Sequence, residues 1–128
     1  QVILAKMAEH KAQGYVILMA SSANQLLAEP IARMVGIEEL ICTKLEIQNG
    51  LPSGELLGEP AFREGKIRKI QAWIQEKDCT LEGSWAYSDS FNDLPLLQFV
   101  QNPVAVTPDE RLRRHARENG WQIIDTVE

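Results

Sequence analysis

The sequence predicts an α/β fold in which helices cover both faces of a doubly wound parallel sheet, giving three layers. Short continuous apolar runs such as Tyr15–Ala20 and Pro103–Val106 are typical of strands covered on both faces of a parallel sheet. These runs alternate with segments in which apolar residues recur at helical spacing. With 128 residues the chain has room for one domain with a core, so we expect residues 1–128 to form a single domain.

The composition limits the possible partners and compartments. The hydrophobic content of 45% and charged content of 24% are ordinary for a globular protein. A net charge of −5 argues against nucleic acid or an anionic membrane as the main partner. The two cysteines, Cys42 and Cys79, form no CxxC or Cys/His cluster, so we expect neither a zinc site nor a disulfide scaffold. Together these features favour a cytoplasmic location.

The first third of the chain predicts a helix, a strand and a second helix. Apolar residues at helical spacing predict a helix over 2–13, which Gly14 would end with a left-handed cap. The apolar run Tyr15–Ala20 predicts a strand. A second helix should run as far as Gly36, and Pro30 should break or restart it because proline lacks the amide donor.

The middle of the chain predicts a small β-hairpin. Apolar and polar residues partly alternate over Leu40–Gln48, as in a strand with one buried face. Asn49-Gly50 is a strong two-residue hairpin turn, so Ser53–Leu57 can return as the partner strand. Pro52 confines that partner to the edge of a sheet.

The second half continues the alternation of helices and strands. A helix that begins near Lys66 buries a stripe at helical spacing, and a capping box with proline at its first helical position starts the last helix. The expected elements are the helix with the stripe Ile67, Ile70, Trp73 and Ile74, the strand at Trp85–Tyr87, the helix Leu94–Val100, the strand Pro103–Val106, the helix from Thr107-Pro-Asp-Glu110 to Gly120, and the strand Trp121–Ile124.

Two aspartates follow the strand at Trp85–Tyr87. Asp89 leaves the end of that strand, and Asp93 stands at the start of the next helix, so both carboxylates can face one point beyond the strand ends. Two hard oxygen ligands suit Mg²⁺, which takes one or two carboxylates together with substrate phosphate oxygens. The alternative is that Asp93 only caps the helix and Asp89 only forms a turn.

Ser21 and Lys66 also lie at a strand end or a helix start, as the two aspartates do. The hydroxyl of Ser21 with the amides of Ser22 and Ala23 would offer a phosphate the start of a helix, unless Ser21–Asn24 merely cap that helix. Lys66 would sit in the first turn of its helix, where the helix dipole opposes a cation. A cation there makes sense if it compensates an external anion, although a solvated surface lysine is the alternative. A hydroxyl, a lysine and a carboxylate pair are what phosphoryl transfer requires.

These residues resemble motifs of a known family. Ser21 after its apolar run, Lys66, and Asp89-Ser-Phe-Asn-Asp93 are similar to motifs II, III and IV of the haloacid dehalogenase superfamily, and most similar to its phosphoserine-phosphatase-like branch, subfamily IB. Ser88 stands where many members have glycine. Further segments agree in order and spacing, so that the resemblance covers nearly the whole chain: Pro30–Ala32, Gly54–Pro60, Phe62–Lys66, Asn102–Val106, Pro108–Asp109 and Gly120–Trp121.

The resemblance implies a Mg²⁺-dependent phosphomonoester hydrolase with a Rossmann-like core and an aspartyl-phosphate intermediate. Its substrate would be a small phosphorylated metabolite. By position, Ser21, Ser22 and Asn92 would bind the phosphate, and Lys66 would neutralise it. Asp89 and Asp93 would hold the metal ion. Ser21 and Lys66 would thus be catalytic.

The family's nucleophile motif is absent from the sequence. Members carry Asp-x-Asp at the end of the first strand, and this chain has no Asp-x-Asp. It also begins at Gln1 rather than Met, so we expect it to be the C-terminal part of such a phosphatase, without the first central strand and the helical cap. The missing strand would lie between Tyr15–Ala20 and Trp85–Ser88. A missing N-terminal segment or a second chain would supply it, because unpaired backbone groups in a core are costly, or the flanking strands would close on each other.

Other functions remain open at this stage. The chain could be a non-catalytic Mg²⁺- or phosphate-binding module that has lost its nucleophile, and a receiver-like domain is a weaker alternative. We expect His10 and His115 to be surface residues rather than ligands. An arginine cluster should be a solvated helix face, with binding of a partner's acidic surface as the alternative: Arg111, Arg113, Arg114 and Arg117.

Overall fold

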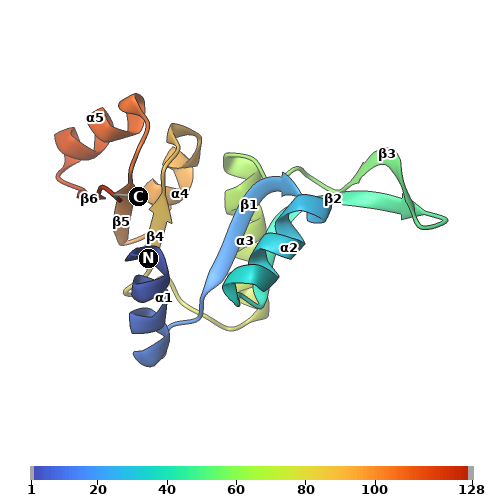
Figure 1. The fold of residues 1–128 in the computed structure, drawn as a ribbon, viewed down its shortest axis with the longest axis horizontal. Helices are drawn as coiled ribbons and strands as arrows, with labels where there is room; N and C mark the ends of the chain where they lie inside the picture. Colours follow the sequence, from blue (N-terminus) through green and yellow to red (C-terminus); the bar gives the residue numbers. More distant parts are fainter. Residues whose placement is uncertain (1, 127–128) are drawn as a thin grey trace. The chain divides into compact units, whose positions relative to one another are not determined.

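The computed structural model describes residues 2–126. The chain divides into two compact units, Gln1–Lys69 and Ile70–Glu128. Helices and parallel strands alternate in both (Figure 1), which confirms the predicted α/β class. The single domain over 1–128 stays a prediction.

The first unit contains the predicted helices and the hairpin. Its elements are α1 (Val2–Ala12), β1 (Leu18–Asn24), α2 (Gln25–Val35), β2 (Glu39–Gln48), β3 (Leu51–Leu57) and the start of α3 (Glu64–Glu76), a helix that ends in the second unit.

Strand β2 pairs with a different neighbour in each of its halves. Its first half runs parallel to β1, and its second half runs antiparallel to β3, so that the hairpin extends beyond β1 (Figure 1). Asn49 and Gly50 have φ angles of +53° and +80°, as the predicted two-residue turn requires. Pro52 lies in β3, which is an edge strand, as predicted. Helix α2 packs against β1 and β2.

Two predictions for the first unit are wrong in detail. The strand lies at Leu18–Asn24 rather than Tyr15–Ala20, because Tyr15 lies just beyond α1 and bonds back to it: its amide donates to the His10 carbonyl and its ring contacts the His10 ring. Helix α2 also continues through Pro30. The proline leaves the carbonyl of Leu26 without its helical donor, and water can replace that donor because both residues are exposed.

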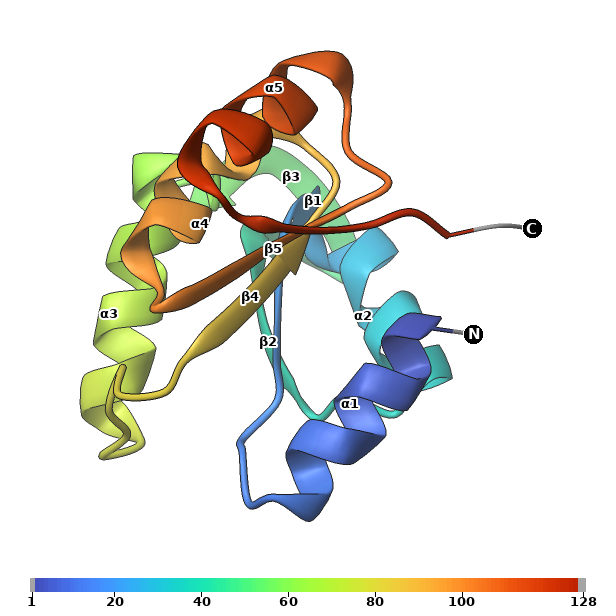
Figure 2. The ribbon, with the colours of Figure 1, turned by 90° about the vertical axis from the view of Figure 1, so that its left-hand side faces the viewer.

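The second unit is a parallel sheet of three strands. Its elements after α3 are β4 (Trp85–Ser88), the short 3₁₀ turn η1 (Phe91–Asp93), α4 (Leu94–Phe99), β5 (Asn102–Val106), α5 (Glu110–Asn119) and β6 (Gln122–Ile124), with the strands in the order β4-β5-β6. Helices α4 and α5 pack over the same face of this sheet (Figure 2). The core between them consists of Ala86, Leu97, Ala105, Leu112 and Ala116.

The start of α5 differs from the predicted capping box. Asp109, not Thr107, caps the helix: its Oδ1 accepts the amide of Leu112 at 2.8 Å. Thr107 follows the last residue of β5, and its amide donates to the carbonyl of Ile124 in β6 at 2.7 Å. The helix ends as predicted at Gly120, whose φ is +69°.

Strands β1 and β4 are each an edge of their own three-stranded sheet. These are the two strands between which the resemblance places the missing central strand. The alternative in which they pair directly stays a prediction. Trp85 at the start of β4 is 39% exposed, although the sequence predicts a buried strand. Of the helices in the described residues, none has the length and apolar content needed to cross a membrane.

Candidate functional site

Ser21 and Ser22 lie in an irregular part of β1. The register of β1 against β2 shifts between Ala20 and Asn24, so that three residues of β1 stand opposite a single residue of β2. Extra residues of this kind re-aim side chains and are common beside active sites. The bulge therefore gives Ser21 a local geometry that a regular strand would not.

The predicted helix-start amides belong to other residues. Helix α2 begins at Gln25, so the amides of Ser22 and Ala23 still belong to the strand. Ser21 Oγ accepts the Ala23 amide at 3.1 Å, and Asn24 caps α2 by accepting the Leu26 amide at 2.9 Å. The cap thus lies three residues beyond Ser21, and Ser21 is not the cap residue. Phosphate binding by Ser21 and Ser22 stays a prediction.

Thr43 of β2 connects the bulge to the segment before α3. Its buried hydroxyl donates to the Ser22 carbonyl at 3.0 Å and accepts the Ala61 amide at 3.0 Å. One side chain therefore fixes both the bulge with Ser21 and the approach to Lys66. Sequence reasoning missed this role, although a threonine on the same side of a strand as Ile41 was the available signal.

Lys66 is buried, with only 3% of its surface exposed. It lies in the first turn of α3, as predicted, and the alternative of a solvated surface lysine is wrong. The turn packs closely on the preceding segment: a Cβ on Gly65 would lie 2.4 Å from the Pro60 carbonyl oxygen. A buried ammonium is accommodated only beside negative charge or dipoles.

An exposed ion pair braces the same turn. The guanidinium of Arg68 in α3 makes bidentate hydrogen bonds to the Glu59 carboxylate, one of them from Nε at 2.8 Å. These bonds hold the pKa of Glu59 below its ordinary value and that of Arg68 above it. The Arg68–Glu59 pair and the close approach of Gly65 to the Pro60 carbonyl both hold the start of α3 against the segment that precedes it.

The predicted metal ligands lie in the second unit. Asp89 directly follows β4 and is exposed, while Asp93 is half-buried. Asp93 precedes α4 but makes no side-chain cap hydrogen bond; its Oδ2 accepts the Ser88 hydroxyl at 2.6 Å instead. Ser88 Oγ in turn accepts the Ser90 amide at 3.1 Å. The alternative in which Asp93 only caps the helix is therefore wrong, and Ser88 orients its carboxylate.

Asp109 holds the loop that carries these aspartates. Its Oδ2 accepts the Phe91 amide at 2.8 Å while its Oδ1 caps α5, and its own amide donates to the Asp89 carbonyl at 2.9 Å. Both carboxylate oxygens are thus engaged with the backbone. Asp109 thus ties the loop to the start of α5, and the sequence indicated it only as part of a capping box.

The ligand set at this loop fits magnesium. Asp89 and Asp93 offer hard carboxylate oxygens, and Mg²⁺ needs only one or two carboxylates when substrate oxygens and water complete its shell. The residues described, 2–126, contain no cluster of three or more His, Cys, Asp or Glu side chains that would hold a metal by themselves. Asn92 is exposed, and its backbone amide donates to the Ser90 hydroxyl oxygen at 3.1 Å.

The predicted residues divide between the two units. Ser21, Ser22 and Lys66 lie in the first, whereas Asp89, Asn92 and Asp93 lie in the second. The metal assignment of the aspartates, the phosphate role of Asn92, and the convergence of both groups on one phosphate stay predictions.

Comparison with known proteins places the chain in a family. The family model of haloacid dehalogenase-like hydrolases matches residues 3–98, three quarters of the sequence and all the predicted site residues. The chain belongs to the haloacid dehalogenase-like hydrolase family. The resemblance predicted from the motifs is thereby confirmed.

Relatives within the haloacid dehalogenase-like family include phosphatases. The chain is 39% identical over 120 residues to a histidinol-phosphatase of Neisseria meningitidis, covering 91% of this chain and 54% of the relative. It is 36% identical over 116 residues to phosphoserine phosphatase SerB1 of Mycobacterium tuberculosis, covering 91% of this chain and 38% of the relative. The chain therefore spans about half or less of the length of these relatives.

A solved structure supports the fold. A Bordetella pertussis protein of unknown function is similar with a TM-score of 0.89 and 37% sequence identity, covering 95% of this chain and 56% of that one. The fold of nearly all of the chain is thus similar to that of a solved structure.

Proposed function

We propose that the protein is a Mg²⁺-dependent phosphomonoester hydrolase that acts on a small phosphorylated metabolite through an aspartyl-phosphate intermediate. The observation that carries this proposal is the burial of Lys66 in the first turn of α3. The helix dipole disfavours a cation there, so the lysine contributes more to binding an anion than to the helix. Membership of the family and the names of the two relatives support the same activity.

Each predicted residue has a role in this proposal. Ser21 donates its hydroxyl to a phosphoryl oxygen, and Lys66 neutralises the phosphoryl charge and orients the nucleophile. Asn92 assists at the phosphate. Asp89 and Asp93 hold the metal ion, and Mg²⁺, when bound, stabilises charge on the transferring phosphoryl group.

The nucleophile lies outside these 128 residues in this proposal. No Asp-x-Asp occurs in the sequence, and β1 and β4 are edge strands with backbone groups able to pair with an added strand. A strand from a further segment or a second chain would carry the nucleophilic aspartate. Two free cysteines suit a reducing compartment, so we place the protein in the cytoplasm.

The decisive experiment has two steps. The coding sequence upstream of Gln1 is determined, and then the 128-residue chain and a longer chain that includes the upstream segment are assayed with p-nitrophenyl phosphate and Mg²⁺. The 128-residue chain should show little or no turnover. A longer chain that includes an upstream Asp-x-Asp strand should be active, and Lys66→Met should lower its kcat/KM by at least about a hundredfold. Lys69→Met on the same helix removes the same charge outside the site and is the matched control.

Two results would count against the hydrolase. One is robust turnover by the 128-residue chain alone, which would show that the nucleophile is within it. The other is an initiator codon at this point with no activity, which would favour a non-catalytic module derived from such a phosphatase.

The metal assignment has its own test. Asp89→Asn should abolish Mg²⁺ binding measured by titration calorimetry, because it removes one of two carboxylate ligands. Asp78→Asn removes the charge of an exposed aspartate that is not a predicted metal ligand, and should leave the titration unchanged. Equal binding by the Asp89 variant and the unmodified chain would remove Asp89 from the metal site.

A further inference from the structure

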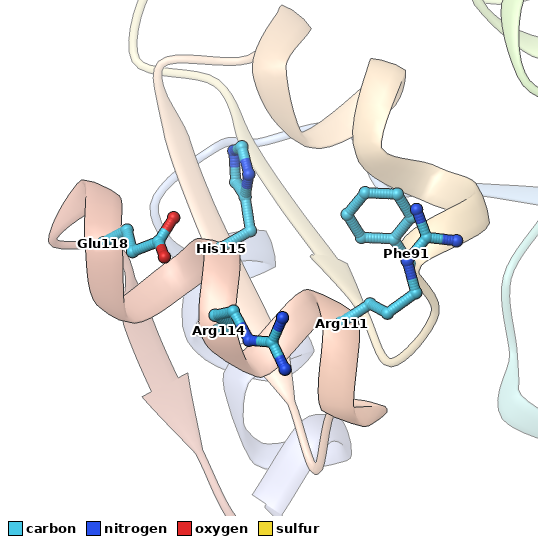
Figure 3. Close-up of a pocket in the computed structure, with 5 residues that line it drawn as sticks. All are labelled: Phe91, Arg111, Arg114, His115 and Glu118. Atoms are coloured by element: carbon cyan, nitrogen blue, oxygen red, sulfur yellow. The ribbon is translucent and has the colours of Figure 1, made fainter.

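A shallow pocket lies on one face of α5, within the second unit. Its volume is about 180 Å³, and Figure 3 shows the side chains that line it: Phe91, Arg111, Arg114, His115 and Glu118. The four helical residues recur at positions i, i+3, i+4 and i+7, which places them on the same face. The fifth, Phe91, is the first residue of η1 and lies in the sequence between Asp89 and Asp93, the two predicted metal ligands.

Aromatic contacts hold two of the lining groups in place. The Arg111 guanidinium lies over the Phe91 ring, with 4.1 Å between its carbon and the ring centroid (Figure 3). The His115 ring packs edge-on against Trp121 at 4.9 Å and against Phe91 at 6.4 Å. A guanidinium that contacts a ring through its central carbon still has N–H groups with which to bind an anion.

The two arginines that line the pocket are not ion-paired with carboxylates of the described residues. Arg68 and Arg113 are each paired with a carboxylate, whereas Arg111 and Arg114 form no ion pair within residues 2–126. Both of these side chains are exposed and therefore accessible to a ligand. Glu118 lies at the end of the pocket away from Phe91 (Figure 3), so it restricts an anion to the Arg111 end.

The size of the pocket limits the ligand to a small one. Pockets for drug-sized molecules have volumes of about 300–1,000 Å³, well above the 180 Å³ here. A single oxyanion group with a few waters fits, since a water takes roughly 30 Å³ of liquid volume.

We propose that this pocket is an anion site for the phosphate or carboxylate group of a small metabolite, bound by Arg111 and Arg114. Arginine forks match the oxygens of both groups. Because the Phe91 amide is bonded to Asp109, and Phe91 lies in the loop between Asp89 and Asp93, an occupied pocket stabilises the conformation of that loop. The ligand therefore acts as an effector, separate from the phosphoryl group that Lys66 would bind.

The test is an NMR titration of the 128-residue chain with inorganic phosphate, without Mg²⁺ and at constant ionic strength kept by sodium chloride. The amide signals of Phe91 and of α5 should shift and saturate. Arg111→Gln and Arg114→Gln should each weaken this binding by about tenfold or more, the effect of losing a charge-assisted hydrogen bond. Arg117→Gln removes the same charge from an exposed residue of the same helix that does not line the pocket, and should leave the affinity unchanged.

Further arms separate this site from others. Lys66→Met should leave the shifts unchanged, so the result does not depend on the proposed hydrolase. A parallel titration with acetate identifies the preferred group: tighter phosphate binding assigns a phosphate-bearing effector, and tighter acetate binding a carboxylate. Equal weakening by Arg117→Gln would show only a general attraction to the helix and would overturn the proposal. Absence of saturable shifts, or their loss in Lys66→Met, would also overturn it.

Discussion

The two units bury their apolar side chains to different extents. In the second unit Leu97 and Leu112 are fully buried between the helices and the sheet. In the first unit α2 turns the small side chains Ala28 and Ala32 inward, while Leu27 and Met34 are 62% and 82% exposed. The large apolar side chains of the second unit are thus buried by other residues of that unit. On α2 of the first unit, large apolar side chains are exposed, and such surfaces often mark interaction sites.

The two units also hold their predicted site residues by different means. In the first, the buried hydroxyl of Thr43 joins the serine bulge to the segment before Lys66. In the second, Asp109 holds the aspartate loop from an exposed position. A hydrogen bond in a buried setting is costly to break, while water replaces an exposed one. The first group of residues should therefore depend more strongly on its support than the second.

The largest effect should come from the packed core of the second unit. We expect Leu97→Ala to lower the free energy of unfolding by about 2–5 kcal/mol, because it removes a fully buried side chain and leaves a cavity. Leu27→Ala makes the same change on the exposed face of α2 and should cost at most about 0.5 kcal/mol. Urea denaturation followed by circular dichroism measures both, and equal losses would contradict the difference in packing.

The second prediction concerns the support of the serine bulge. Thr43→Val keeps the shape of the side chain but leaves the Ser22 carbonyl and the Ala61 amide without their partner. Loss of the partner of the buried Ala61 amide should cost about 1–3 kcal/mol, and amide hydrogen exchange at Ala61 should become faster.

An exposed threonine provides the control for that prediction. Thr80 accepts one backbone amide at the surface, from Glu82, so Thr80→Val should change stability by less than about 0.5 kcal/mol. If Thr43→Val were equally mild, the role of Thr43 as a buried connection would be wrong.

The alternation of elements could be predicted because it is local. Apolar runs and helical periodicity located nearly every element, and the Asn49-Gly50 turn and the end of α5 at Gly120 were correct. The errors occur where a tertiary contact outweighs the local pattern. Tyr15 has the composition of a strand but bonds to the end of α1, and Thr107 has the sequence of a helix cap but donates to β6.

The sequence was sufficient to choose the candidate site residues. It did not indicate which other residues hold them in place. Lys66 could be chosen because a cation in a first helical turn is unexpected, and the structure buries it. Thr43 and Asp109 act through partners 18 or more residues away, namely Ala61, Ser22 and Phe91. No spacing rule within a single element indicates such pairs, so only the fold reveals them.

The third prediction tests the support of the aspartate loop. Asp109→Ala removes the cap of α5 and the acceptor for the Phe91 amide, and should cost about 0.5–2 kcal/mol of stability. It should also weaken Mg²⁺ binding, because Asp89 and Asp93 flank the released turn. Glu110→Ala removes the same charge at the next position and should leave the Mg²⁺ titration unchanged. Loss of stability with unchanged Mg²⁺ affinity would limit Asp109 to a helix cap.

The smallest effect should come from the exposed ion pair between Arg113 of α5 and Asp125. Two hydrogen bonds, of 2.6 and 3.1 Å, hold the pKa of Asp125 below its ordinary value. A carboxyl whose pKa is lower in the folded than in the unfolded protein stabilises the fold at pH values above its unfolded-state pKa. This stabilisation is lost as the pH falls through the folded-state pKa. Asp125→Asn should therefore lower the melting temperature slightly at neutral pH, and the difference should vanish in acid and shrink in high salt, since the pair is exposed. A difference that grew on acidification would assign the effect of Asp125 to something other than its charge.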